Sequence, residues 1–278
     1  MPDPTTPRRR ARITRPPTPG AGLDPTERDQ WASRFGVAAT QIDHDFAISH
    51  LLAALNPLAD RFVFYGGTAL SRTFLPDLRL SEDIDLLSNG ARRDVAPLLD
   101  QELRDYMEPR FGELTADPWL ADATRDTQAC VLRVGRVDVQ VQLIDGRDYP
   151  NWPTQHSTIE QRYTGIPEAT LHTYTAPAFA GAKTSAWIET TRNAPRDLYD
   201  LWALACAGHI DVDAARLYRR HGPTGGYPER NLLPAAPPSE REWQDALSHQ
   251  CIPQVTAADA YETVASTWAR AVTAAKSR

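Results

Sequence analysis

The chain has 278 residues, 41% of them hydrophobic, which is enough apolar material for one large or two modest domains. Its formal net charge of −6 gives no overall signature of nucleic-acid binding, so any RNA contact must come from a local basic patch. The sequence shows no membrane-spanning run, no signal-peptide core, and no cysteine spacing typical of zinc or disulfide frameworks. We therefore expect a cytoplasmic protein without a membrane partner.

The N-terminal region divides into a tail and two helices. Residues 1–22 are rich in proline and arginine and lack apolar periodicity, which predicts a disordered basic tail. Asp24 and Pro25 then supply a cap and a first-turn proline for a helix. A second helix with an apolar face is predicted from about residue 38 to residue 55, where Asn56 and Pro57 end it. Both helices are expected to shield a sheet.

The central stretch, residues 62–88, reads FVFYGGTALSRTFLPDLRLSEDIDLLS. It predicts a strand, a double-glycine turn, a short helix, a loop and a second strand. On that second strand Asp83 and Asp85 share one face, whereas Ile84 and Leu86 point into the core. Two neighbouring carboxylates repel each other unless a cation lies between them, so a divalent metal site is the first hypothesis.

Gly66 and Gly67 lie where the first strand passes into the helix, a place where backbone N–H groups can bind a triphosphate. Alone, a glycine pair is weak evidence, because a tight turn needs no ligand. Followed by Ser81, Asp83 and Asp85, it predicts a phosphate cradle beside paired metal ligands. This combination is typical of a nucleotidyl transferase.

Downstream, residues 92–110 predict a helix, and residues 129–134 and 137–144 predict the two arms of a hairpin. Asp138 lies on the polar face of the second arm, so it could complete the metal site if this arm neighbours the aspartate pair. A solvated face of an antiparallel sheet explains the same pattern equally well.

The second half of the chain changes character. Residues 145–166 are expected to be loop-rich, and a short strand is predicted at 171–175. Helices are predicted at 177–190, 195–207 and 211–221, with a last helical region ending near residue 275. The predicted domains are therefore 23–175, an α/β unit, and 176–278, a helical unit that closes an active-site cleft. Lys183 is one of only two lysines among the 30 basic residues, which suggests a specific need for an ammonium group there.

The segment GGTALSRTFLPDLRLSEDIDLL, with Lys183 and the RDLYDL segment at residues 196–201, resembles the AbiEii/AbiGii-type nucleotidyltransferase toxins. These include the MenT-like toxins of type IV toxin–antitoxin systems. The resemblance implies an α/β (α+β) fold, a polymerase-β-like mixed sheet with a helical C-terminal half. It also implies that Asp197 is the essential acid of the RDLYDL segment and orients Lys183, with Asp200 second.

The candidate site residues fall into three groups. The catalytic candidates are Asp83, Asp85, Lys183 and Asp197. The nucleotide-binding candidates are Gly66, Gly67, Thr68, Ser71, Arg72, Ser81 and Lys183, and the metal ligands are Asp83, Asp85 and Asp138, with Asp200 and Arg79 as additions. Other interpretations stay open: Arg72 and Arg79 clamp phosphates or form surface ion pairs, Asp197 only caps its helix, and Asp200 pairs with Arg192 or Arg196.

The expected activity is metal-dependent transfer of NMP from an NTP to the 3′ end of RNA, most simply tRNA, which would block aminoacylation and growth. Mg²⁺, or Mn²⁺, is the expected cofactor, and a cognate antitoxin is the expected protein partner. Two alternatives remain open. One is NMP transfer to a protein or small molecule, and the other is a catalytically idle GTP-binding module.

Overall fold

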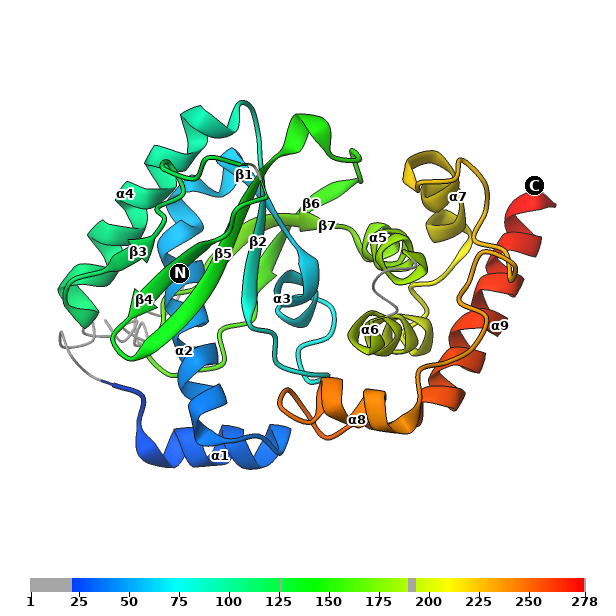
Figure 1. Cartoon of the computed structure of the whole chain (residues 1–278), viewed down its shortest axis with the longest axis horizontal. Coiled ribbons are helices and arrows are strands. Elements are labelled where there is room, and N and C mark those ends of the chain that lie inside the picture. The colour runs from blue at the N-terminus through cyan, green and yellow to red at the C-terminus, as the bar shows by residue number, and fades with distance from the viewer. Residues whose placement is uncertain (1–21, 126, 190–193, 278) are drawn as a thin grey trace, which may run out of the picture.

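The computed structural model describes residues 22–125, 127–189 and 194–277. The predicted basic tail lies outside these residues except for its last position. Up to residue 174 the described elements include both strands and helices, and from residue 176 onward they are helices (Figure 1). The first part comprises α1 (Pro25–Phe35), α2 (Ala39–Leu55), η1 (Asn56–Arg61), β1 (Phe62–Tyr65), α3 (Gly66–Ser71), β2 (Asp83–Ser88), α4 (Arg92–Phe111), β3 (Thr115–Asp117), β4 (Cys130–Val134), β5 (Val137–Asp145), η2 (Gly146–Asp148), β6 (Thr154–Ile159) and β7 (Ala169–Tyr174). The second comprises α5 (Ala176–Ile188), α6 (Pro195–Cys206), α7 (Val212–His221), α8 (Glu240–Leu247) and α9 (Ala257–Lys276).

The strands of the described residues form one seven-stranded sheet in the order β3-β4-β5-β2-β1-β7-β6. The pairs β2–β5 and β1–β7 are parallel, and the remaining neighbours are antiparallel. The mixed α/β fold class expected from the sequence is therefore confirmed. The predicted hairpin is confirmed as β4 and β5, and β5 does lie next to β2. Strand β6 was missed, because its segment was expected to be loop-rich.

The first helix begins as its sequence predicts. The side chain of Asp24 accepts hydrogen bonds from the backbone N–H groups of Thr26 and Glu27, at 2.9 and 3.0 Å. Helices α2 and α4 pack together and against β5, so they cover one face of the sheet (Figure 1). Ile84 and Leu86 are fully buried in this core. The predicted alternation of core and non-core side chains along β2 is therefore confirmed, and its two aspartates point away from the core.

A buried ion cluster fixes the helix that follows the glycine pair. Asp45 on α2 accepts hydrogen bonds from Arg72 at 2.8 Å, from Arg162 at 3.1 Å and from the hydroxyl of Tyr163 at 2.8 Å. Burial alone would raise the pKa of Asp45, but the two guanidinium groups hold it below its usual value. The expectation that Arg72 binds nucleotide phosphate is wrong in this fold, because its guanidinium lies inside the protein and serves as a structural tie.

The helical part shares its core with the sheet. A single hydrophobic cluster contains residues from Ala47 on α2 to Ala275 on α9. Trp187, Trp243 and Trp268 are among its largest fully buried side chains. The division into domains 23–175 and 176–278 stays a prediction, since the two parts are packed through this common core.

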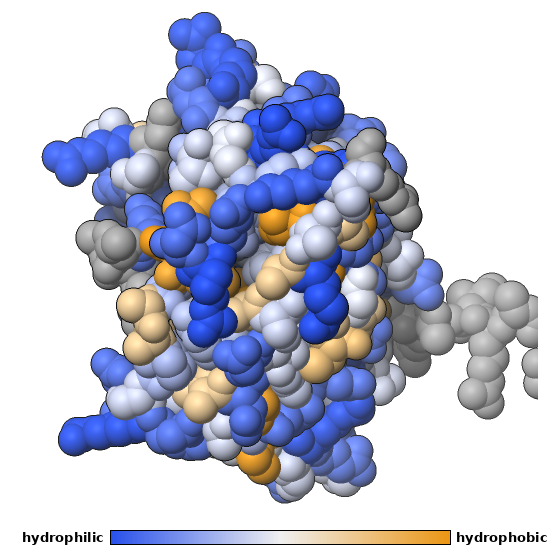
Figure 2. All heavy atoms as spheres, turned by 90° about the vertical axis from the view of Figure 1, so that its right-hand side faces the viewer, coloured by the Kyte–Doolittle hydropathy of each residue, from blue (hydrophilic) through white to orange (hydrophobic). Residues whose placement is uncertain are grey.

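No helix in the described part of the chain is long and apolar enough to cross a membrane. The molecular face on the side of α7 and α9 shows mainly hydrophilic side chains, with apolar ones in separate patches (Figure 2). This face therefore presents mostly polar groups to solvent.

Candidate active site

The two aspartates of β2 line a cavity of about 930 Å³. Parallel pairing with β5 places Gln140 beside Asp83 and Gln142 beside Asp85. Antiparallel pairing with β1 places Tyr65 opposite Asp85. The register therefore brings both carboxylates and a tyrosine to the same sheet face, at the end of β1 where the glycine pair begins.

The glycine pair is required by close contacts. Gly66 has φ +78°, and a Cβ at this position would lie 2.1 Å from Oδ2 of Asp85. A Cβ at Gly67 would lie 2.9 Å from Nη2 of Arg79 and 3.0 Å from Oγ of Ser81. The missing side chains let functional groups of the β2 strand and its preceding loop lie directly against the backbone.

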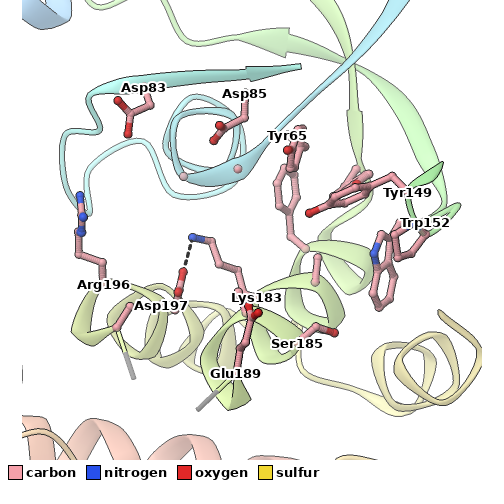
Figure 3. A pocket seen from close by; sticks show the side chains of 18 of the residues that line it. Tyr65, Asp83, Asp85, Tyr149, Trp152, Lys183, Ser185, Glu189, Arg196 and Asp197 are labelled. Atoms are coloured by element: carbon pink, nitrogen blue, oxygen red, sulfur yellow. Dashed lines mark hydrogen bonds and ion pairs between the residues drawn. The ribbon is translucent and has the colours of Figure 1, made fainter. Parts of the chain in front are cut away.

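Lys183 on α5 and Asp197 on α6 line the opposite wall of the same cavity (Figure 3). Nζ of Lys183 lies 2.9 Å from Oδ1 of Asp197 and 2.8 Å from Oδ2 of Asp200. Behind them, Arg79 donates to both oxygens of Asp200, each at 2.7 Å. Asp200 therefore pairs with Lys183 and Arg79, whereas the sequence suggested Arg196 or Arg192, the latter lying outside the described residues.

This network keeps Lys183 charged. Burial would lower its pKa, but the carboxylates of Asp197 and Asp200 outweigh burial and raise it. A lysine with a raised pKa releases its proton less readily than a free lysine. The structure therefore presents Lys183 as a fixed cation on the cavity wall.

The environment of Asp83 is suited to a cation. Its carboxylate forms no hydrogen bond or ion pair with any residue that the structure describes. Burial and the neighbouring charge of Glu82 raise its pKa, and the weaker fields of Arg196 and His44 do not offset them. Together with Asp85, it offers the oxygen ligands that Mg²⁺ and Mn²⁺ prefer, so the residues present fit the metal that the sequence implied.

The other end of the cavity is aromatic. Tyr65, Tyr149 and Trp152 line it (Figure 3), and Tyr174 also belongs to its lining. The ring of Tyr65 lies 5.4 Å from that of Tyr149 and 5.9 Å from that of Tyr174, measured between centroids. The cavity thus joins a charged end, suited to phosphates, to an aromatic end, suited to a planar ring.

The cavity contains most but not all of the predicted site residues. Its lining includes Gly66, Gly67, Arg79, Ser81, Asp83, Asp85, Lys183 and Asp197. Thr68, Ser71, Arg72, Asp138 and Asp200 are not part of that lining. Thr68 and Ser71 are buried and use their hydroxyls on backbone carbonyls, those of Asp83 and Thr68 respectively, so the structure gives them positioning contacts and no access to a nucleotide.

Asp138 lies on the strand next to the aspartate pair, where its carboxylate is paired with Arg133. It lies on β5 two residues before Gln140, which is the residue opposite Asp83. Its carboxylate is exposed and bonded at 2.8 and 2.9 Å to Arg133 on the paired strand β4. The structure thus gives Asp138 an ion pair with Arg133, and its place in the metal site stays a prediction.

Several lining residues had no part in the sequence-based site. Tyr65 immediately precedes the glycine pair. Its position at the end of a predicted strand was the one sequence feature that could have indicated it as a site residue. Tyr149 and Trp152 lie in the segment without periodicity after β5, so only the tertiary structure reveals their position.

Comparison with known proteins gives a consistent result. Residues 50–267 match the family model described as nucleotidyl transferase AbiEii toxin, type IV toxin–antitoxin system. The fold is similar to that of MenT4, a nucleotidyltransferase toxin from Mycobacterium tuberculosis H37Rv, with a TM-score of 0.63, 22% identity, and coverage of 87% of this chain and 88% of that one. A putative nucleotidyltransferase from H. pylori aligns with a TM-score of 0.51, 15% identity, and coverage of 87% and 98%. No curated protein matches the chain significantly.

Proposed function

Because the chain belongs to the AbiEii nucleotidyl transferase toxin family of type IV toxin–antitoxin systems, we propose that it transfers NMP from an NTP to the 3′ end of an RNA. Membership of this family makes the chain a nucleotidyltransferase and implies a nucleotide substrate and an antitoxin. The acceptor stem of tRNA is the RNA we propose, following the family resemblance. Transfer there would block aminoacylation, and the reaction would take place in the cytoplasm, where both substrates occur.

One observation carries the proposal: a single cavity is lined by Asp83 and Asp85 on one wall and by Lys183 and Asp197 on the other. Its volume of about 930 Å³ lies within the range of about 300–1,000 Å³ that small-molecule sites occupy. The two halves of the chain therefore supply complementary charges to one space. An NTP with its counter-cation needs both.

Asp83 and Asp85 are proposed to hold Mg²⁺, or Mn²⁺, through their carboxylate oxygens. When bound, such an ion neutralises triphosphate charge and makes the attacking hydroxyl more acidic. Gly66 supports this arrangement because it leaves room for the carboxylate of Asp85 against the backbone.

Lys183 is proposed to bind a phosphate of the NTP as a permanent cation. Asp197 holds its ammonium group at 2.9 Å on the cavity wall, and Asp200, itself clamped by Arg79, holds it from behind. This double support fixes the position of a long flexible side chain before substrate arrives.

The aromatic end is proposed to receive a nucleobase. Tyr65 and Tyr149 offer ring faces, and stacking of a base on such a face contributes about 1–3 kcal/mol. At the other end, Arg196 lines the cavity with a side chain that is 45% exposed, which suits contact with an RNA phosphate. A local arginine of this kind is needed because the whole chain is acidic.

In the proposed reaction, the 3′-hydroxyl oxygen of the RNA bonds to the α-phosphorus of the NTP. The bond between that phosphorus and the oxygen shared with the β-phosphate breaks, and pyrophosphate leaves. The hydroxyl proton passes to solvent.

The experiment incubates the purified chain with each α-labelled NTP, Mg²⁺ and total tRNA, and in parallel with a protein extract. Label in RNA, released as 3′-terminal nucleotide, is the expected result. Label in protein or a small product would favour the alternative acceptors, and NTP binding without transfer would favour an idle binding module.

Asp85→Asn provides the required control, because it removes a charge from the cavity at constant size. It should abolish both labelling and growth inhibition. If it retains full activity, the assignment of the site is wrong.

A further inference from the structure

Three side chains with metal-binding chemistry converge on the sheet edge formed by β6 and β7. They are Asp60 of η1, His156 of β6 and His172 of β7. One ligand atom from each lies within 4.8 Å of the other two. None of the three lines the candidate active-site cavity.

The sheet register explains why the histidines meet. His156 and His172 are direct partners in the antiparallel β6–β7 pair, so their side chains emerge on the same face. Their rings are stacked, with centroids 4.1 Å apart and planes inclined by 29°. The two imidazoles are therefore held side by side by the backbone.

The carboxylate arrives from a segment that is tied to the same edge. Asn56, at the start of η1, accepts a hydrogen bond of 2.8 Å from the backbone N–H of Thr170 on β7. The carbonyl of Asp60 accepts one of 3.0 Å from the side chain of Asn89. With η1 fixed at both ends, Oδ1 of Asp60 lies 3.9 Å from Nε2 of His156, a separation that a shared ion can bridge.

One ring nitrogen of His172 lacks a hydrogen-bond partner in the part of the chain that the structure describes. Nδ1 of His172 is buried and has no hydrogen-bond partner within the described residues. A buried ring nitrogen without a partner is unusual in a folded protein, because its loss of water contacts is not compensated.

We propose that Asp60, His156 and His172 form a binding site for a divalent transition-metal ion, with Zn²⁺ as the occupant. Two imidazoles and one carboxylate suit Zn²⁺, whereas Mg²⁺ prefers oxygen ligands. The side chains of His156 and Asp60 are 56% and 86% exposed, so the ion can enter from solvent and keep a water ligand.

The site has a structural consequence for the cavity. His172 and Tyr174 lie on the same face of β7, two residues apart, and Tyr174 lines the cavity. An ion bound here would link η1, β6 and β7 at His172, two residues along β7 from Tyr174 at the aromatic end of the cavity. It therefore stabilises the edge of the sheet that carries this wall.

The test is Zn²⁺ binding by the full chain, without a polyhistidine tag and after treatment with a chelator. Calorimetry should show one Zn²⁺ per chain, and Co²⁺ substitution should give the visible absorption of a low-coordinate nitrogen-ligated ion. Zn²⁺ should also raise the melting temperature of the chain. Mg²⁺ should not displace the bound Zn²⁺.

His156→Asn and His172→Asn should each weaken Zn²⁺ binding at least tenfold and remove the Zn²⁺-dependent rise in melting temperature. His209→Asn, a histidine outside the cluster, is the matched control and should bind as wild type. Circular dichroism of the metal-free variants establishes that they fold.

Asp85→Asn tests whether this site is independent of the candidate active site. The variant should bind Zn²⁺ as wild type does. If the double variant His156→Asn/His172→Asn binds Zn²⁺ as tightly as wild type, or if wild type binds none at micromolar concentration, the proposal is wrong. Since binding is measured without NTP or RNA, failure here leaves the transfer reaction untouched.

Discussion

The carboxylate of Asp85 lies directly against the α-carbon of Gly66, where even one added carbon would come within 2.1 Å of Oδ2. The first glycine of the pair therefore creates space for a proposed metal ligand of the neighbouring strand. Its positive φ of +78° adds a second reason for glycine at this position.

We expect Gly66→Ala to lower the rate of nucleotidyl transfer by about 100-fold, because a displacement of Asp85 by roughly 1 Å misplaces the proposed ion. The measurement is the rate of label incorporation from NTP into RNA. Gly208→Ala is the matched control, since Gly208 has the same φ of +78° but no neighbour within 4 Å. It should lose about 1–2 kcal/mol of stability and keep its activity. Equal activity losses in both variants would contradict the role of the contact.

The positions of Asp83 and Asp138 lead to opposite expectations for one chemical change. Asp83→Asn removes a charge from the cavity and should reduce transfer by at least about 100-fold, with weaker Mn²⁺ binding detected by paramagnetic relaxation. Asp138→Asn only breaks an exposed pair with Arg133 and should keep transfer within about twofold of wild type. A large loss of transfer activity in Asp138→Asn would indicate that Asp138 is the third carboxylate of the metal site.

Lys183→Met should impair both stability and activity. The side chain of Lys183 is 11% exposed and pairs with two carboxylates, so its removal should cost about 3–5 kcal/mol in the free energy of unfolding. The affinity for NTP should fall as well. Lys276→Met, which breaks a surface pair with Glu229, is the control and should cost no more than about 1 kcal/mol.

The double variant Lys183→Met/Asp197→Asn distinguishes the two effects. Removing the charge of Asp197 should recover part of the stability, because one fewer carboxylate is left unpaired. Transfer should remain lost. Recovery of activity with stability would mean that Lys183 acts only through folding.

Asp45→Asn should destabilise the chain by about 3–5 kcal/mol at neutral pH, because it leaves the buried Arg72 and Arg162 without their carboxylate. Asp77→Asn, in a surface pair with Arg34, should change stability by at most about 1 kcal/mol. Urea denaturation measures both.

The same residue gives a pH dependence with a defined sign. The pKa of Asp45 is lowered from 3.8 in the folded state, so its contribution is complete well above pH 3.8 and is lost as the pH falls below that value. The stability difference between wild type and Asp45→Asn should therefore shrink on acidification below about pH 4. A difference independent of pH down to the folded pKa would contradict the ionised pair.

The sequence by itself determined the local structures. The alternation of Asp83 and Asp85 with Ile84 and Leu86, and the hairpin arms around Gly135, are set by periodicity over neighbouring residues, and the structure confirms the resulting elements. The glycine pair and the landmarks at Ser81 and Lys183 were enough to indicate the family.

Only the tertiary structure decided which partner each charged residue has. Arg72, Arg79 and Asp138 all belonged to the predicted site, yet Arg72 pairs with Asp45, Arg79 with Asp200, and Asp138 with Arg133. Arg72 and Arg79 depend on contacts 27 and 121 residues apart, and strand register decided the position of Asp138. The aromatic wall and the histidine pair have the same origin, because strand pairing and packing between distant segments bring those rings together.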